Sequence, residues 1–204
     1  MKCGKAFLRP DATPKDLPGA KEVERPVLPD TLTDCLTGRE IPFSNRDNIR
    51  QKILGFLLEE KGYRKEDFSV DREIRFDLDV QKVVSLVDIS VVLGGRTVMV
   101  WKCASGSLVS RERQVLASAR LLEDYIIPFA AVTNGIDLEF LDSLSGKIIG
   151  CGFGAIPARD ELMKSQTTLP VTPVNKNKLL SEQRILYTYD AISCPTSCAH
   201  HSGG

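Results

Sequence analysis

The sequence predicts an α/β fold in which helices flank a mixed β-sheet. Apolar residues recur at helical spacing in residues 46–61 and again in residues 110–125. Three strand-like segments stand between these two helices, and a short apolar strand follows the second helix. This order requires a crossover through the second helix, which would make two strands of the sheet parallel.

Length and composition favour one compact domain with appendages. The chain has 204 residues, 42% of them hydrophobic and 26% charged, which is ordinary for a globular protein. Acidic and basic residues balance at 27 each, so any basic surface for nucleic acid must be local. No apolar run approaches the ~18 residues of a membrane span, and no secretory signal follows the basic N-terminus. We therefore expect a cytoplasmic protein without a membrane partner.

Proline and turn residues divide the chain into three parts. Residues 1–30 contain five prolines, which disfavour helix and sheet, and we expect an extended arm. Residues 31–150 form the predicted core, and residues 151–204 form a C-terminal extension. Two similar octets, Asp34–Ile41 and Asp142–Ile149, carry the Thr/Ser-Gly pattern of tight turns and predict two hairpins.

The first helix has clear end signals. Ser44 or Asn45 can cap its N-terminus, and Asp47 lies in the first turn, where a negative charge is favourable. Gly62 follows the last turn at the position where glycine commonly ends a helix.

Three strands follow the first helix. Residues 68–76 alternate imperfectly and predict a strand with one wet face. Residues 83–92 and 97–102 are more apolar and predict buried strands joined by a short glycine turn. The first of these buried strands contains one acid, Asp88, and the second ends at Lys102.

The C-terminal half is less regular. After the helix at 110–125, residues 128–135 predict a short buried strand that ends in a turn. Residues 161–165 fit a short helical turn, and 167–177 contain two prolines and fit a linker. Residues 179–189 fit either a helix or a strand that docks on the core.

Asp88 and Lys102 carry the candidate chemistry. Phosphodiester hydrolysis uses a metal ion to activate water, and Mg²⁺ prefers carboxylate oxygens. A lysine nearby can orient the water or stabilise negative charge. Antiparallel pairing of the two buried strands would let these side chains meet if both pointed to one face. The alternative is a buried acid paired with Lys102 or Arg96 for structural reasons.

Short motifs follow one another in a fixed order between Asn45 and Gly150. They comprise a helix start (Asp47, Arg50, Gln51), an acid in an apolar strand (Val87-Asp88-Ile89), a strand ending in lysine (Val100-Trp101-Lys102), a glutamine on the next helix (Gln114) and a closing strand (Ile127-Pro128-Phe129). This set resembles the N-terminal nuclease module of type I restriction enzyme R subunits, within the PD-(D/E)xK superfamily. The resemblance implies a restriction endonuclease-like fold.

The resemblance also implies roles for individual residues. Asp88 would bind Mg²⁺, and Lys102 and Gln114 would complete the catalytic site of a DNA endonuclease. Val100 departs from the pattern, because it stands where the E-x-K motif has its glutamate and cannot bind a cation. Glu112 would be the replacement metal ligand, since some relatives carry the acid on this helix.

Other readings of the acids and bases stay open. Asp47 and Glu73 are further candidates for the replacement carboxylate, and Glu112 could instead be an ordinary exposed helix residue. Arg111 and Arg113 could bind DNA phosphates at the start of the second helix, or form a solvated helix face.

Six cysteines in a chain without an export signal do not predict a disulfide framework. Cys103 and Cys151 adjoin apolar segments and are expected to be buried thiols. The segment Cys194–His201 contains four soft-metal ligands, among them Cys194 and Cys198. Their spacing is not that of a known zinc finger, so we do not expect zinc or iron there.

Three functions follow from these patterns. The first is a Mg²⁺-dependent endodeoxyribonuclease with a borrowed carboxylate. The second is a degenerate, catalytically inactive nuclease-fold module that binds nucleic acid or a partner protein. The third is a redox or metal-sensing accessory protein built on the tail cysteines. DNA is the expected ligand, and a partner subunit would have to supply a helicase motor; the oligomeric state is left open.

Overall fold

The computed structural model describes residues 29–166 and 168–193. Residues 1–28 of the predicted arm and the Cys194–His201 tail lie outside the described residues. The third function suggested by the sequence, which depends on that tail, therefore stays a prediction.

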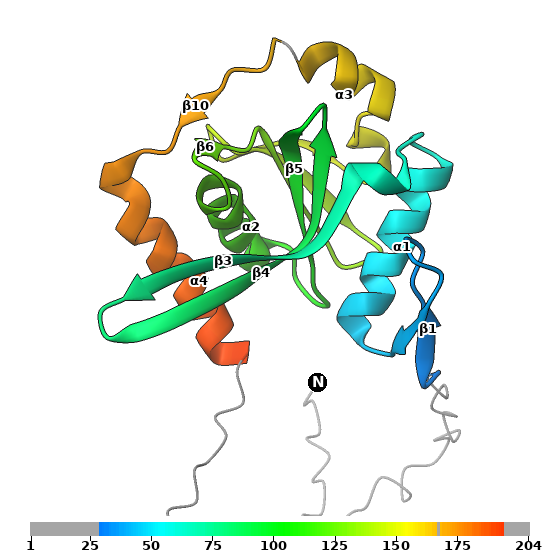
Figure 1. Ribbon diagram of the computed structural model, residues 1–204, viewed down its shortest axis with the longest axis horizontal. Coiled ribbons are helices and arrows are strands. Elements are labelled where there is room, and N and C mark those ends of the chain that lie inside the picture. Colours follow the sequence, from blue (N-terminus) through cyan, green and yellow to red (C-terminus); the bar gives the residue numbers. More distant parts are fainter. Residues whose placement is uncertain (1–28, 167, 194–204) are drawn as a thin grey trace, which may run out of the picture.

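A six-stranded mixed sheet forms the centre of the molecule (Figure 1). Its strands, in spatial order, are β3 (Phe68–Leu78), β4 (Gln81–Leu93), β5 (Arg96–Cys103), β7 (Phe129–Thr133), β8 (Leu138–Asp142) and β9 (Lys147–Cys151). Neighbouring strands are antiparallel except β5 and β7, which are parallel. The predicted α/β class and crossover are confirmed.

Helices cover both faces of this sheet (Figure 1). On one face α1 (Asn45–Glu59) buries Ile53 and Leu57 in an apolar cluster that includes Trp101 of β5. On the other face α2 (Val109–Leu121) and α4 (Leu179–Ser193) enclose a second cluster that includes Val100. Consecutive β5 residues thus point to opposite faces, as the strand repeat of two requires.

The local signals at both ends of α1 act as the sequence predicts. The Ser44 side chain accepts a hydrogen bond from the backbone N–H of Asp47, so Ser44 is the N-cap. Gly62 follows the helix with φ at 71°, a left-handed conformation that glycine adopts without strain. The Ser44 cap fixes where α1 begins, and with it the position of the first-turn residue Arg46.

The second helix ends earlier than predicted, at Leu121 rather than near residue 125. Glu123 accepts hydrogen bonds from Arg72 of β3, at 2.7 Å, and from the Thr97 hydroxyl, which hold the chain against the sheet. Pro128 also disfavours helical geometry in the preceding residue. The residues after this bend form a two-residue strand, β6 (Tyr125–Ile126).

In residues 151–166 and 168–193, the C-terminal extension has more regular secondary structure than the sequence predicts. The expected helical turn is a helix, α3 (Arg159–Gln166), and the expected linker contains β10 (Thr172–Pro173), which pairs with β6. The undecided segment at 179–189 forms α4, which packs on α2 through the buried Leu186.

The remaining short elements include the two predicted hairpins. One hairpin is formed by β1 (Thr31–Thr33) with β2 (Glu40–Pro42), and the other by β8 with β9. The other short elements are the 3₁₀ turns η2 (Lys65–Asp67), η3 (Phe153–Ala155) and η4 (Lys176–Lys178). Cys103 is buried as predicted, but the prediction for Cys151 is wrong. Cys151 is exposed and lies at the end of β9, the edge strand of the sheet in the part of the chain that the structure describes.

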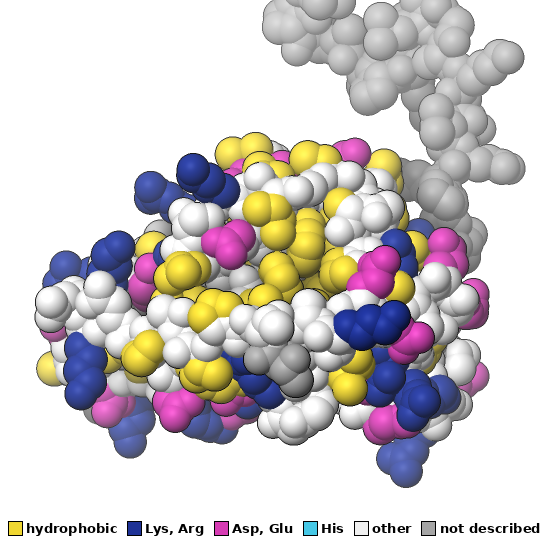
Figure 2. Space-filling model, turned by 90° about the horizontal axis from the view of Figure 1, so that it is seen from above, with side chains coloured by type: hydrophobic (Ala, Val, Ile, Leu, Met, Phe, Trp, Pro, Cys, Tyr) yellow, Lys and Arg dark blue, Asp and Glu magenta, His cyan; other side chains and the backbone are white. Residues whose placement is uncertain are grey.

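On the face of the molecule shown in Figure 2, neither basic nor acidic side chains predominate. Hydrophobic side chains gather in the middle of this face, and basic and acidic side chains alternate around them. This pattern agrees with the net charge of zero and means that a nucleic-acid site must be local. In the ranges that the structure describes, no helix is long and apolar enough to cross a membrane.

Candidate functional site

The structure brings Asp88 and Lys102 together. β4 and β5 pair antiparallel as far as Ile89 and Trp101, which are the neighbours in sequence of Asp88 and Lys102. The Lys102 Nζ lies 3.4 Å from the Asp88 Oδ1 and donates to the backbone carbonyl of Leu86 at 3.2 Å.

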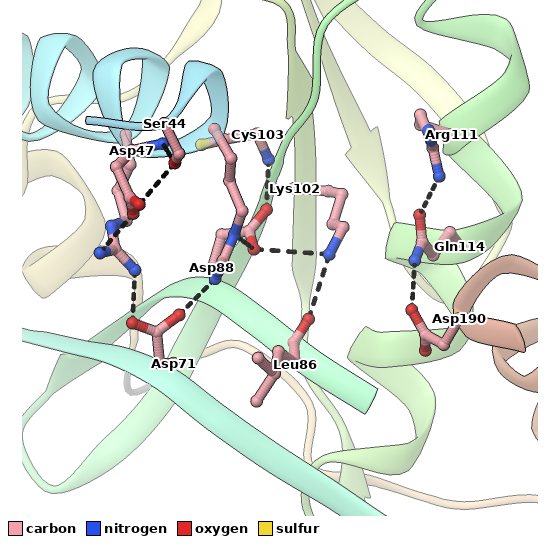
Figure 3. Close-up of polar contacts among 12 residues, drawn as sticks. Ser44, Asp47, Asp71, Leu86, Asp88, Lys102, Cys103, Arg111, Gln114 and Asp190 are labelled. Atoms are coloured by element: carbon pink, nitrogen blue, oxygen red, sulfur yellow. Dashed lines mark hydrogen bonds and ion pairs between the residues drawn. The ribbon is translucent and has the colours of Figure 1, made fainter. Parts of the chain in front are cut away.

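Both carboxylate oxygens of Asp88 are engaged, and its side chain is 0% exposed. The backbone N–H of Cys103 donates to Oδ2 at 2.6 Å. The Nε of Arg46, in the first turn of α1, donates to Oδ1 at 2.7 Å (Figure 3). A buried carboxylate needs such compensation because removing a charge from water is costly. Two cations and one backbone donor thus contact the Asp88 carboxyl group.

These contacts extend into a chain of alternating charges (Figure 3). We call it the ion-pair chain, and its members in order are Asp47, Arg50, Asp71, Arg46, Asp88 and Lys102. Arg50 binds Asp71 at 2.5 Å and Asp47 at 2.7 Å. Arg46 binds both Asp71 and Asp88. Three acids and three bases alternate, so the ion-pair chain carries no net charge.

Asp71 has an unusual position in β3. Its neighbours Val70 and Arg72 pair with Ile89 and Val87 of β4, which puts Asp71 level with Asp88. Asp71 itself has φ at 50°, in the left-handed region that few residues other than glycine adopt. The sequence prediction did not include Asp71; the imperfect alternation of its strand was the one signal available.

Two pKa shifts reflect these contacts. Burial alone would raise the pKa of Asp71, but hydrogen bonds from Arg50 and Arg46 hold it below its usual value. Burial alone would lower the pKa of Arg46, but the charges of Asp88 and Asp71 raise it. Both shifts favour the charged forms, which is the condition for a stable ion pair.

Val100, which the sequence resemblance places where E-x-K has its glutamate, makes apolar contacts. Its side chain is 0% exposed and belongs to the cluster under α2, with Val115, Ala130 and Val132. A carboxylate at this position would point into that apolar cluster.

A cleft of about 370 Å³ opens beside Lys102. Arg46, Lys102, Arg111 and Gln114 are among its lining residues, together with Asp190 of α4. The Gln114 amide donates to Asp190 at 3.2 Å and accepts from Arg111 at 3.2 Å (Figure 3). Gln114 thus lies in the same cleft as Lys102, but its side chain is hydrogen-bonded to Asp190 of α4 and to Arg111 of its own helix.

Two predicted residues on α2 lie apart from the cleft. Glu112 is not among the lining residues; its carboxyl group lies against Glu139 of β8. Burial, and then the charge of Glu112, raise the pKa of Glu139. Arg113 is exposed and also lies outside the cleft lining.

The other candidates have partners of their own. Glu73 forms an ion pair with Arg75 on the same strand. Arg96 donates to the backbone carbonyls of Leu169 and Pro170, so Lys102 rather than Arg96 is the strand cation at Asp88. Within the described residues, no group of three or more His, Cys, Asp or Glu side chains is arranged to hold a metal ion.

Comparison with known proteins identifies the family. A family model described as the N terminus of the type I restriction enzyme R protein (HSDR_N) matches residues 45–157, more than half of the chain. No curated protein and no solved structure matches this chain. The matched region begins at the first residue of α1 and includes every member of the ion-pair chain. The chain therefore belongs to the family of type I restriction enzyme R protein N-terminal domains.

Proposed function

We propose that this chain is a nuclease-fold module that binds DNA at its cleft without cleaving it. The observation that carries the proposal is that protein donors already bind both carboxylate oxygens of Asp88. Its two oxygens are already bound by Arg46, Lys102 and the Cys103 N–H, and its side chain has no contact with solvent. An acid in this state serves the structure of the cleft rather than water activation.

The donor set at Asp88 does not fit a magnesium ion. Mg²⁺ is usually bound by one or two free carboxylates and keeps several waters. Val100 offers no oxygen, and Glu112 faces Glu139 rather than the cleft. Asp71 is close to Asp88, but two arginines already bind it. We therefore assign no step to a metal ion here.

The cations of the cleft favour an anionic ligand. Arg46 is 34% exposed and Lys102 is 13% exposed, so both side chains can be reached from solvent. Arg111 stands in the first turn of α2, and the N-cap residue Leu108 makes no side-chain hydrogen bond to this turn. Helix N-termini and arginines are common phosphate contacts on DNA. We expect phosphates of the DNA backbone to bind between Arg111 and Lys102.

The binding test is a fluorescence anisotropy titration of a labelled DNA duplex in EDTA over a range of salt concentrations. Binding should weaken steeply with salt, since each phosphate contact adds ~0.9 to the slope of log affinity against log salt. Arg111→Ala should weaken binding and reduce that slope by about 1. Lys147→Ala removes the same charge from the exposed edge strand β9 and should change neither. Absence of binding at low salt, or equal effects of both variants, would contradict the proposal.

The cleavage test uses supercoiled plasmid with Mg²⁺ or Mn²⁺. We expect the plasmid to stay supercoiled at protein concentrations that saturate binding. Metal-dependent nicking that disappears in Lys102→Ala would show that the site is catalytic and would overturn the second half of the proposal.

A further inference from the structure

We infer that Arg46 is a built-in cation: its guanidinium occupies a two-carboxylate site, formed by Asp71 of β3 and Asp88 of β4, that would otherwise hold a divalent metal ion. The inference rests on the proposed function, in which no metal acts at Asp88. Beyond that proposal, it identifies Asp71 as the second carboxylate of the site and the Arg46 guanidinium as the group that fills it.

The two carboxylates are neighbours because of the strand register. Val70 pairs with Ile89 and Arg72 with Val87, so Asp71 and Asp88 lie level across the two strands. Both carboxylates contact the one guanidinium of Arg46, so their negative charges lie close together and repel each other. A cation between them offsets this repulsion.

Arg46 satisfies this need from the helix layer. Its Nε donates to Asp88 Oδ1 at 2.7 Å, and its Nη2 donates to Asp71 Oδ1. A guanidinium is always protonated, and its planar fork can serve two oxygens of different residues at once. It thus bridges the two carboxylates as a metal ion would, although it supplies one positive charge instead of two.

Two further positive charges lie on either side of the site. Lys102 contacts the same oxygen of Asp88 as Arg46 does, and Arg50 binds the other oxygen of Asp71. Each of the two carboxylates therefore contacts the shared Arg46 and one further cation, Lys102 for Asp88 and Arg50 for Asp71. This arrangement neutralises both acids without an ion from solvent.

The position of Arg46 is fixed by the start of α1. Ser44 caps the helix on the N–H of Asp47, and Asp47 in turn binds Arg50, so the first turn is tied to the ion-pair chain. The site is open on this side, because the Arg46 side chain is 34% exposed and that of Asp71 is 41% exposed. A small ion could enter from solvent if the guanidinium were removed.

The test is to remove the guanidinium and ask whether a metal ion takes its place. Arg46→Ala should have a lower Tm than wild type in EDTA, and millimolar MnCl₂ should restore most of that loss. Wild type should show no shift with MnCl₂. Isothermal titration should give at least tenfold tighter Mn²⁺ binding to Arg46→Ala than to wild type.

Two control variants make the result specific. Arg46→Ala combined with Asp71→Asn should lose the response to MnCl₂, since one of the two carboxylates is neutral. Arg46→Lys keeps a positive charge and should not gain Mn²⁺ binding. If Arg46→Ala is unfolded in EDTA, refolding on addition of MnCl₂, followed by the fluorescence of Trp101, gives the same answer.

The outcomes separate the two proposals. No gain of Mn²⁺ binding by Arg46→Ala, or an equal gain by the double variant, would overturn the built-in cation. The proposed function would still stand if wild type bound DNA in EDTA without cleaving it. Metal-dependent nicking by wild type would instead overturn the proposed function.

Discussion

Neutralising Asp88 should destabilise this protein, which is opposite to the effect expected in a cluster of uncompensated acids. Where carboxylates repel one another, Asp→Asn relieves the repulsion and raises stability. Here Asp88 lies between Arg46 and Lys102, so Asp88→Asn removes the charge that both cations face. The sign of the change in Tm therefore distinguishes the two kinds of site.

The magnitude follows from the bonds to Asp88. Two are short, 2.6 Å from Cys103 N–H and 2.7 Å from Arg46 Nε, and the contact with Lys102 at 3.4 Å is weaker. A hydrogen bond to a charged group contributes ~1.5–3 kcal/mol, roughly twice a neutral one. Replacing the charge while keeping one acceptor should thus cost about 3 kcal/mol. For a protein of this size that is a fall in Tm of roughly 6–12 °C.

The assay is thermal and urea unfolding followed by the fluorescence of Trp101, the only tryptophan, which is buried next to Lys102. Asp124→Asn is the matched control, because Asp124 is exposed and its neutralisation should change stability by less than ~0.5 kcal/mol. An unchanged or higher Tm for Asp88→Asn would refute the reasoning, since it would mean that the two cations do not stabilise the ionised acid.

Three further predictions concern other acids. Asp190→Asn should tighten DNA binding about two- to fivefold in the anisotropy assay, because it removes a negative charge beside the phosphate-binding side chains; unchanged or weaker binding would count against the cleft as the DNA site. Glu112→Gln should raise Tm at pH 7 and have little effect near pH 4. The charge of Glu112, after burial, raises the pKa of Glu139, so this repulsion grows as pH rises above the usual glutamate value of about 4.3; a pH-independent difference would contradict it. Asp71→Asn should lower Tm at neutral pH, and the difference from wild type should shrink in acid. The pKa of Asp71 is lowered in the folded state, so its stabilisation is complete above about pH 4 and lost as pH falls below it; a difference that persists well below that pH would argue against the ion pairs with Arg46.

Much of the fold could be predicted because its signals are local. The glycine turn between two apolar runs predicts the β4–β5 hairpin, and the Ser44 cap sets the start of α1. The crossover through α2 follows from the order of elements alone, since parallel neighbours need such a connection. The approach of Asp88 to Lys102 depends on this hairpin register, which the two apolar faces restrict.

The rest of the site depends on contacts between distant segments. Arg46 reaches Asp88 across 42 residues of sequence, and no local pattern marks that arginine as different from any other in a helix start. Asp71 joins the site because its backbone is left-handed within a strand. Aspartate tolerates this conformation better than most residues, but an aspartate in the sequence does not predict it. Asp190 reaches Gln114 because α4 packs on α2, and the sequence left α4 undecided.

The most direct measurement is a crystal structure of the wild-type protein grown or soaked in MnCl₂, with anomalous data to locate manganese. We expect the Arg46 guanidinium to remain bound to Asp88 and Asp71, with no manganese peak within coordination distance of either carboxylate. A manganese ion on Asp88, with the arginine displaced, would contradict the claim that the Arg46 guanidinium fills this site.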